Sequence, residues 1–177
     1  GWQPAMMDRL WALEQAGVFM IEQPFATDAW QAHQIAQQQL TQLHISLDES
    51  LNDLADITRG LAIADAFTLK QAKVGGIWPT LQAIHQISVV DKIPWIGGML
   101  SSGVGRAVDL ALASMPATRQ VPADSSSASR YFERDIVLAQ PEIVAGRLPV
   151  PSTPGLGVTI DWSAVADLQA SDTITIK

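Results

Sequence analysis

The sequence predicts an α/β fold in which short strands alternate with amphipathic helices along one parallel sheet. Short apolar runs recur at a spacing of about 25 residues, and each is followed by a polar loop and a helical pattern. Strands that are covered by helices on both faces read as continuous apolar runs of this kind. With 177 residues, 47% of them hydrophobic, the chain is long enough to form one domain with a core.

Five strands are expected from the apolar runs. They cover residues 18–21, 43–47, 66–69, 93–96 and, as a short final strand, 119–121. Helical patterns lie between them, the first between residues 6 and 13 and the last over 106–114. Ser50 is the expected N-cap of the helix after the second strand, with Leu54 and Ile57 on its buried face.

The composition argues against several classes of protein. A formal net charge of −7 does not suit nucleic-acid binding, because phosphate recognition requires clustered Lys and Arg. No apolar run approaches the ~18 residues of a membrane helix, so no membrane association is expected. The absence of cysteine removes disulfides, thiolate nucleophiles and cysteine-based zinc sites. No basic and then apolar leader opens the chain, and we expect a cytoplasmic protein.

A charged residue follows each of the first three apolar runs: Glu22, Asp48 and Lys70. Since the carboxyl ends of parallel strands meet at one edge of a sheet, we expect these side chains to face one space. An open doubly wound sheet is the alternative. No G-x-G-x-x-G follows the first strand, however, and the charged residues follow successive strands rather than one switch point. We therefore predict part of a TIM (β/α)8 barrel.

The three charges suggest a metal site. Two carboxylates that share a space repel each other, and each raises the pKa of the other. A Mg²⁺ ion removes this conflict, because it is a hard cation that takes carboxylate, substrate and water oxygens as ligands. Lys70 could then act as a base, if burial or positive charge lowers its pKa, or as a fixed cation beside a developing negative charge. The alternative is that all three are strand-end charges in solvated loops.

The segments around these residues, together with three later ones, resemble motifs of the enolase superfamily, in its o-succinylbenzoate synthase/N-acylamino acid racemase branch. Six motifs in order along nearly the whole chain make the resemblance specific. The motifs are IEQP (21–24), LDES (47–50), LK with VGG (69–76), GGML with GVGRA (97–107), the segment 124–136, and PGLGV (154–158).

The resemblance implies that the chain corresponds to about strands 4 to 8 of the barrel with their helices, without the first strands and the capping domain. Residues 1–145 would form this part of the barrel, and the Pro/Gly-rich tail 146–177 would pack back on the barrel or on a capping domain. The third metal ligand and a second lysine of the family would lie before Gly1. We therefore expect a complementary N-terminal segment or a homo-oligomer, because open strand edges promote aggregation.

The resemblance also implies roles for single residues. Glu22 and Asp48 would be ligands of Mg²⁺, with Mn²⁺ as an alternative, and the metal would bind the substrate carboxylate and stabilise the enediolate formed by proton abstraction beside it. Lys70 would be a general acid/base in racemisation and a stabilising cation in dehydration. The residues on the side of a small carboxylate substrate would be Gly98, Met99, Ser101, Ser102, Asp124 and Ser126. The family usually has Glu at the position of Ser101.

The function implied is a Mg²⁺-dependent lyase, a dehydratase of the o-succinylbenzoate synthase type in menaquinone biosynthesis. N-acylamino acid racemisation at the same site is the alternative, and nothing in the sequence separates the two. An alternative of another class is a catalytically incomplete fragment or subunit, which keeps two metal ligands and needs a complementary N-terminal segment.

Several other residues have no metal-ligand or triad spacing. The histidines, His33, His44 and His85, are expected to be structural, and Lys73 is either a second cation of the site or a solvated loop lysine. The six tryptophans are expected to pack helices against strands. They are Trp2, Trp11, Trp30, Trp78, Trp95 and Trp162.

Overall fold

The computed structural model describes residues 1–139 and 141–169. The chain forms two compact units. The first consists of residues 1–97 and 112–124, and the second of residues 98–111 and the described residues beyond 124. The predicted division between residues 145 and 146 is a different one, and it stays a prediction.

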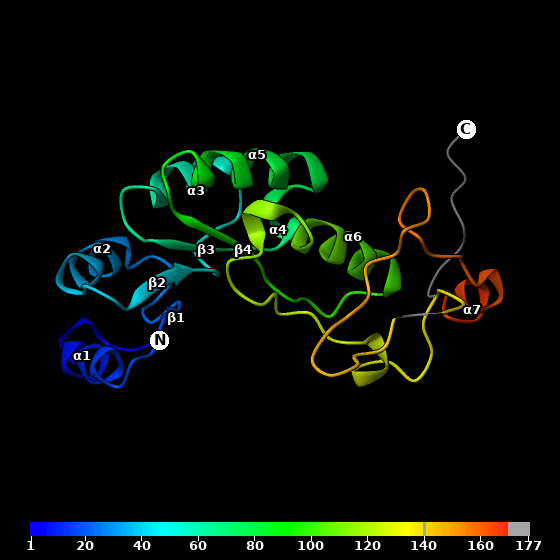
Figure 1. Cartoon of the computed structure of the whole chain (residues 1–177), viewed down its shortest axis with the longest axis horizontal. Helices are drawn as coiled ribbons and strands as arrows, with labels where there is room; N and C mark the ends of the chain where they lie inside the picture. Colours follow the sequence, from blue (N-terminus) through cyan, green and yellow to red (C-terminus); the bar gives the residue numbers. More distant parts are fainter. Residues whose placement is uncertain (140, 170–177) are drawn as a thin grey trace. The chain divides into compact units, whose positions relative to one another are not determined.

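The first unit is built on a four-stranded parallel sheet (Figure 1). The strands lie in sequential order, and they are β1 (Met20–Glu22), β2 (His44–Leu47), β3 (Ala66–Leu69) and β4 (Ile93–Ile96). Neighbouring strands pair in parallel throughout. Sequential order without a reversal is the arrangement of a (β/α)8 barrel and not of a doubly wound sheet. The predicted α/β class and its parallel sheet are confirmed.

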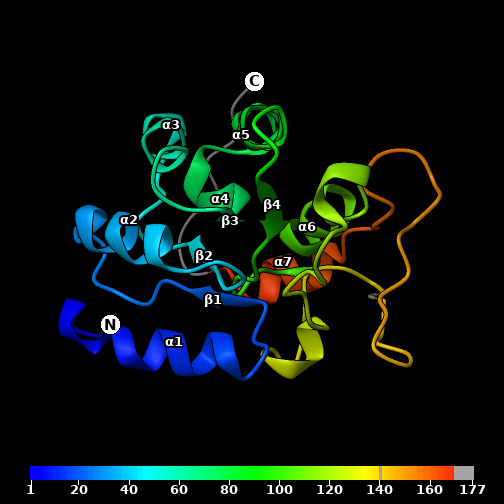
Figure 2. The same ribbon diagram turned by 60° about the vertical axis from the view of Figure 1, so that its left-hand side comes forward.

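Helices connect the strands, as the alternating pattern predicts. The α-helices are α1 (Met7–Gln15), α2 (Trp30–Gln39), α3 (Leu54–Gly60), α4 (Gln71–Val74), α5 (Ile77–Ser88), α6 (Gly103–Ala113) and α7 (Trp162–Asp167), and the 3-10 turns are η1 (Pro4–Met6), η2 (Pro116–Thr118) and η3 (Ala128–Arg130). Helices α3 and α5 pack side by side on the same side of β3 and β4 (Figure 2). In the part of the chain that the structure describes, no helix is long and apolar enough to cross a membrane.

Two local predictions are wrong. Residues 119–121 form a turn and a bend instead of a fifth strand. The prolines on either side, Pro116 and Pro122, have no N–H to donate to a ladder, and the Asp124 N–H bonds to Ile96 O at 3.1 Å only after this turn. The N-cap of α3 is Asp53, whose carboxylate accepts from two backbone N–H groups of the first turn, and not Ser50.

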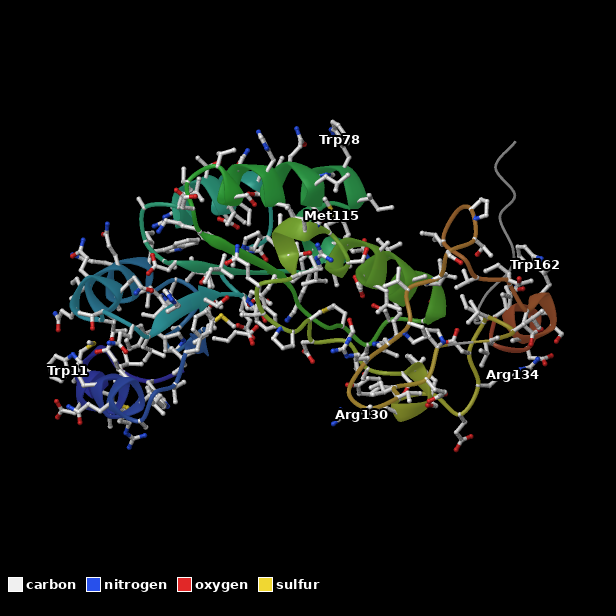
Figure 3. The ribbon with its side chains drawn as sticks, in the orientation of Figure 1. Trp11, Trp78, Met115, Arg130, Arg134 and Trp162 are labelled. Carbon is white, nitrogen blue, oxygen red and sulfur yellow. The ribbon has the colours of Figure 1, made fainter. Side chains whose placement is uncertain are left out.

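The tryptophans do not share one role. Trp95 in β4 is buried, as predicted, but the side chains of Trp78 and Trp162 are 70% and 74% exposed. Figure 3 shows Trp78 pointing away from the sheet and Trp162 on the surface of α7. The Arg59 guanidinium lies over the Trp30 ring, with its Cζ 4.2 Å from the ring centroid. The expectation that tryptophans pack helices against strands is therefore wrong for Trp78 and Trp162.

In the second unit, the chain after residue 158 returns to residues near 137. Val137 and Ile160 form an antiparallel bridge, and Arg134 binds the carboxylates of Asp161 and Asp167 at 3.3 and 2.6 Å. These contacts hold α7 within this unit. Whether the tail also packs on a barrel or a capping domain stays a prediction.

Glu14 ties the end of α1 to the loop before β2. Its Oε1 accepts the backbone N–H groups of Thr41, Gln42 and Leu43 at 2.6, 2.7 and 3.1 Å. These bonds to the charged form lower the pKa of Glu14. The stabilisation is present above the ordinary pKa of a glutamate and is lost as the pH falls through the lowered value.

We expect Glu14→Gln to lower Tm at pH 7, because a neutral amide oxygen is a weaker acceptor for three N–H groups. The difference from wild type should shrink below pH 4, and thermal melts at both pH values measure it. Glu133→Gln, at an exposed carboxylate, is the control. An equal loss of Tm for both variants would contradict the prediction.

Candidate metal and active site

The three predicted charges lie at the carboxyl edge of the sheet. Glu22 is the last residue of β1, Asp48 follows β2 directly, and Lys70 follows β3 directly. The structure brings them together: the Lys70 Nζ donates to Asp48 Oδ2 in an ion pair, and the neighbouring carboxyl group of Asp48 raises the pKa of Glu22. Their catalytic and metal-binding roles remain predictions.

Asp48 is at the centre of this cluster. Its side chain is only 3% exposed, and a second lysine reaches it besides Lys70. Lys73 Nζ donates to Asp48 O at 3.0 Å and lies 3.7 Å from Asp48 Oδ1. Of the two alternatives for Lys73, the structure therefore shows a cation beside Asp48 and not a solvated loop lysine.

Gln23 orders the loop that carries Asp48. Its Oε1 accepts from the backbone N–H of Asp48 at 2.9 Å and of Ser50 at 3.3 Å, and its Nε2 donates to Ser50 Oγ at 2.8 Å. Gln23 adopts φ 40°, which is uncommon for a residue with a side chain. Sequence reasoning assigned it no role, although an amide between a site carboxylate and Pro24 was a usable signal.

His33 lies beside the Gln23 side chain. It is fully buried, its Nε2 lies 3.3 Å from the Phe25 N–H and 3.4 Å from Gln23 Nε2, and its Nδ1 lies 2.9 Å from Ala29 O. These partners require a neutral ring with the proton on Nδ1, and burial lowers the pKa of His33 accordingly. The predicted structural role of His33 agrees with this geometry.

The pKa values of Glu22 and Lys70 are both raised, but for different reasons. Desolvation of the carboxyl group raises the pKa of Glu22 to about 7, and the negative charge of Asp48 acts in the same direction, while Thr68 and Lys70 oppose them. Burial alone would lower the pKa of Lys70, but its hydrogen bond to Asp48 and the charges of Asp48, Glu22 and Glu49 outweigh it, so that this pKa is raised. Lys70 is therefore held as a cation in this arrangement.

The carboxylates suit a hard cation. Asp48 Oδ1 is buried and has no hydrogen-bond partner, and the Glu22 carboxyl group adjoins Asp48. Such an oxygen retains lone pairs that Mg²⁺ or Mn²⁺ can use. Within residues 1–139 and 141–169, no group of three His, Cys, Asp or Glu side chains could hold a metal. The described residues therefore offer two neighbouring carboxylates, Glu22 and Asp48, as candidate ligands.

Metal affinity is expected to depend on pH through Glu22. Because its pKa is raised to about 7, the metal-free pair keeps a proton at lower pH, and binding must release it. We expect the affinity for Mn²⁺ to fall about tenfold per pH unit below pH 7 and to level off above it. Loss of the free Mn²⁺ signal in electron paramagnetic resonance titrations measures this. A slope that persists unchanged in Glu22→Gln would contradict it.

The predicted substrate residues divide between the two units. Asp124 belongs to the first unit, where its N–H bonds to the end of β4 at Ile96 O. The others, Gly98, Met99, Ser101, Ser102 and Ser126, belong to the second unit. There, the Arg106 guanidinium donates to Met99 O and Ser101 O, both at 3.3 Å, and Asp135 accepts the Gly103 N–H that opens α6. Contacts with a substrate remain predictions for all six.

Sequence reasoning also missed a set of buried polar side chains beneath the site. Ser46 and Thr68 lie inside β2 and β3, two positions before Asp48 and Lys70, and each is at most 1% exposed. Because side chains in a strand alternate with period two, each faces the same side as the charged residue after it. A polar residue inside an otherwise apolar strand was the available signal.

Comparison with known proteins identifies the family to which the fold belongs. The model of the family described as "Enolase C-terminal domain-like" matches residues 1–164. Over 86% of this chain there is 36% identity to an o-succinylbenzoate synthase from Geobacillus kaustophilus, and over 87% there is 39% identity to an N-succinylamino acid racemase from Thermus thermophilus. The crystal structure of an enolase superfamily member from Listeria innocua superposes with a TM-score of 0.86 at 35% identity, over 94% of this chain and 45% of that one.

The chain spans only about two fifths of the curated relatives, 41% of the synthase and 42% of the racemase. The matches nevertheless cover most of this chain. The chain belongs to the enolase C-terminal domain-like family.

Proposed function

We propose that the protein that carries this chain is a metal-dependent enzyme of the o-succinylbenzoate synthase type, a dehydratase in menaquinone biosynthesis that acts in the cytoplasm. The observation that carries the proposal is the cluster of Glu22, Asp48 and Lys70 at the carboxyl edge of the sheet. Relatives named o-succinylbenzoate synthase support the reaction type. Relatives named N-succinylamino acid racemase, which match at similar identity, support racemisation as the second candidate.

In this proposal Glu22 and Asp48 would hold Mg²⁺, or Mn²⁺, through Asp48 Oδ1 and the Glu22 carboxylate. The bound cation would supply positive charge to a carboxylate of the substrate. Lys70 is already a cation beside the carboxylates, so in a dehydration it would stand next to negative charge that develops on the substrate. In a racemisation it would exchange a proton with the substrate carbon. Lys73 adds a second positive charge at Asp48.

The other-class alternative, a catalytically incomplete chain, is part of the same proposal. The described residues include no group of three His, Cys, Asp or Glu side chains that could hold a metal, and β1 and β4 are the edges of the described sheet. We propose that a complementary N-terminal segment, or a second copy of the chain, supplies the missing ligand and strands. On this basis the 177 residues by themselves should bind metal weakly and show no turnover.

The test is an assay of the complete gene product and of these 177 residues alone. We expect the complete product to form o-succinylbenzoate with Mg²⁺ and to lose this activity in excess chelator, while the shorter chain is inactive. Racemisation of N-succinylamino acids, followed by loss of optical rotation, compares the second candidate on the same preparation. Absence of both activities in the metal-loaded complete product would overturn the proposal.

A further inference from the structure

One residue, Gln23, links the carboxyl ends of β1 and β2 in the first unit. Its backbone N–H donates to Ser46 O at 2.8 Å, which extends the ladder between the two strands by one bond. Its side-chain Oε1 reaches two residues further and accepts the N–H groups of Asp48 and Ser50, at 2.9 and 3.3 Å. The amide oxygen therefore takes the place that a backbone carbonyl of a longer β1 would have.

The orientation of this amide is fixed by its partners. Backbone N–H groups can only donate, so the atom that faces Asp48 and Ser50 is the oxygen. The Nε2 donates to Ser50 Oγ at 2.8 Å and to Phe25 O at 3.2 Å, and Ser50 Oγ donates onward to Thr27 O at 2.8 Å. The amide oxygen and nitrogen cannot exchange places without the loss of all these bonds.

The backbone of Gln23 indicates that its side chain is needed at this position. Its φ of 40° lies in the left-handed region, which glycine adopts freely and a residue with a side chain adopts only under strain. A strained conformation persists where the surrounding contacts hold it. Here these contacts are the bonds of the amide and the backbone bond to Ser46 O.

Gln23 thereby restricts the position of Asp48. Asp48 and Ser50 are each only 3% exposed, so without the amide oxygen the N–H groups of two buried residues would lose their acceptor. The carbonyl of Asp48 is held separately, because it accepts from the Leu51 N–H at 2.9 Å and from Lys73 Nζ at 3.0 Å. The Asp48 carboxylate therefore extends from a backbone that is fixed on both sides.

We propose that Gln23 is a positioning residue that fixes the spacing between the carboxylates of Glu22 and Asp48, and with it the choice of cation. Gln23 follows Glu22 directly in the chain and binds Asp48 through its amide, so that one residue connects the two. Mg²⁺ requires near-ideal octahedral geometry at about 2.0–2.1 Å, whereas Ca²⁺ accepts flexible sites at about 2.3–2.6 Å. A loosened pair should therefore lose Mg²⁺ more than Ca²⁺. This inference rests on the proposed function, because it assumes that the two carboxylates bind a metal.

The experiment measures Mn²⁺ binding to the complete gene product by electron paramagnetic resonance, with Mg²⁺ and Ca²⁺ as competitors and independently of turnover. Gln23→Met keeps the length of the side chain and removes its hydrogen bonds. We expect it to weaken Mn²⁺ and Mg²⁺ binding about 10- to 100-fold. Ca²⁺ binding should weaken by a smaller factor, so that the ratio of Mg²⁺ to Ca²⁺ affinity falls. A loss of folded protein alone would reduce the binding of all three ions equally.

Gln37→Met is the matched control. Gln37, in α2, bonds to the amino end of β2 in the same way: its Oε1 accepts the Ile45 N–H at 2.7 Å, and its Nε2 donates to Leu43 O at 3.3 Å. Both glutamines are half-buried. The control variant should also lose thermal stability, because it too leaves a backbone N–H without its acceptor. Its affinity for each of the three ions should equal that of wild type.

Ser50→Ala is a milder variant of the same network. It removes one acceptor of the amide Nε2 but leaves the bonds of Oε1 in place. We expect a smaller loss of Mn²⁺ affinity than in Gln23→Met and a shift of the ion ratio in the same direction. If Gln23→Met does not fold, a Ser50→Ala variant with the affinity and ion ratio of wild type would overturn the inference.

The outcomes separate the inference from the proposed function. Wild-type binding with unchanged affinity in Gln23→Met, or equal losses in Gln23→Met and Gln37→Met, would overturn the inference and leave the metal site in place. Losses of the same factor for Mg²⁺ and Ca²⁺ in Gln23→Met would do the same. No Mn²⁺ binding by the wild-type product would overturn the proposed function together with the inference.

Discussion

Lys70→Ala is expected to reduce turnover of the complete enzyme by about 10²- to 10⁴-fold while Mg²⁺ binding is unchanged or tighter. The loss is the usual effect of removing an acid/base group or a charge that stabilises a transition state. Metal binding should not suffer, because Lys70 Nζ is an ion-pair partner of Asp48 and competes with a metal for that carboxylate. Steady-state kinetics and Mn²⁺ titration of the same preparation measure the two effects.

The control for this variant is Lys92→Ala. Lys92 is likewise partly buried, and its Nζ pairs with Asp65 Oδ1 at 3.0 Å, on a residue that precedes β3 and not at its carboxyl end. The control should keep full turnover. Activity that survives in Lys70→Ala would remove this lysine from the mechanism, and a parallel loss of metal affinity would show that it supports the ligands instead.

Asp109→Asn is expected to stabilise the protein at pH 7 by about 2 to 3 kcal/mol. Asp109 lies in α6 and is 4% exposed, and burial raises its pKa to about 6 against the opposing charge of Arg106. Each pKa unit corresponds to about 1.4 kcal/mol. A carboxyl group whose pKa is raised by folding is favourable when protonated, so wild-type stability falls as the pH rises from about 4 through 6. The amide has no charge to bury and no such loss.

Urea unfolding of wild type and Asp109→Asn at pH 5 and pH 7.5 measures this difference. The gap in the free energy of unfolding should be larger at pH 7.5. Asp28→Asn, at an exposed carboxylate of the first unit, should change stability little at either pH. A gap for Asp109→Asn that does not depend on pH would contradict the titration of Asp109 as its cause.

The local patterns of the chain were sufficient for the sheet and for the candidate ligands. The first four apolar runs became the four strands, within two residues at each end, because burial on both faces requires continuous apolar residues. Glu22, Asp48 and Lys70 could be placed at one edge because parallel strands end together. The prediction of a fifth strand at 119–121 was wrong because so short a run, with Pro116 and Pro122 on either side, carries too little pattern to outweigh turn formation.

What the sequence by itself determined is which residues end the strands and which family they resemble. Only the tertiary structure decided how those residues interact. Asp48 pairs with both Lys70 and Lys73, Gln23 holds the Asp48 loop, and Trp95 reaches Ser46 across two strands. The reason is physical. Strand positions follow from the hydrophobicity of successive residues, which can be read directly from the sequence. Hydrogen bonds and pKa shifts depend instead on distances between residues that are far apart in the chain.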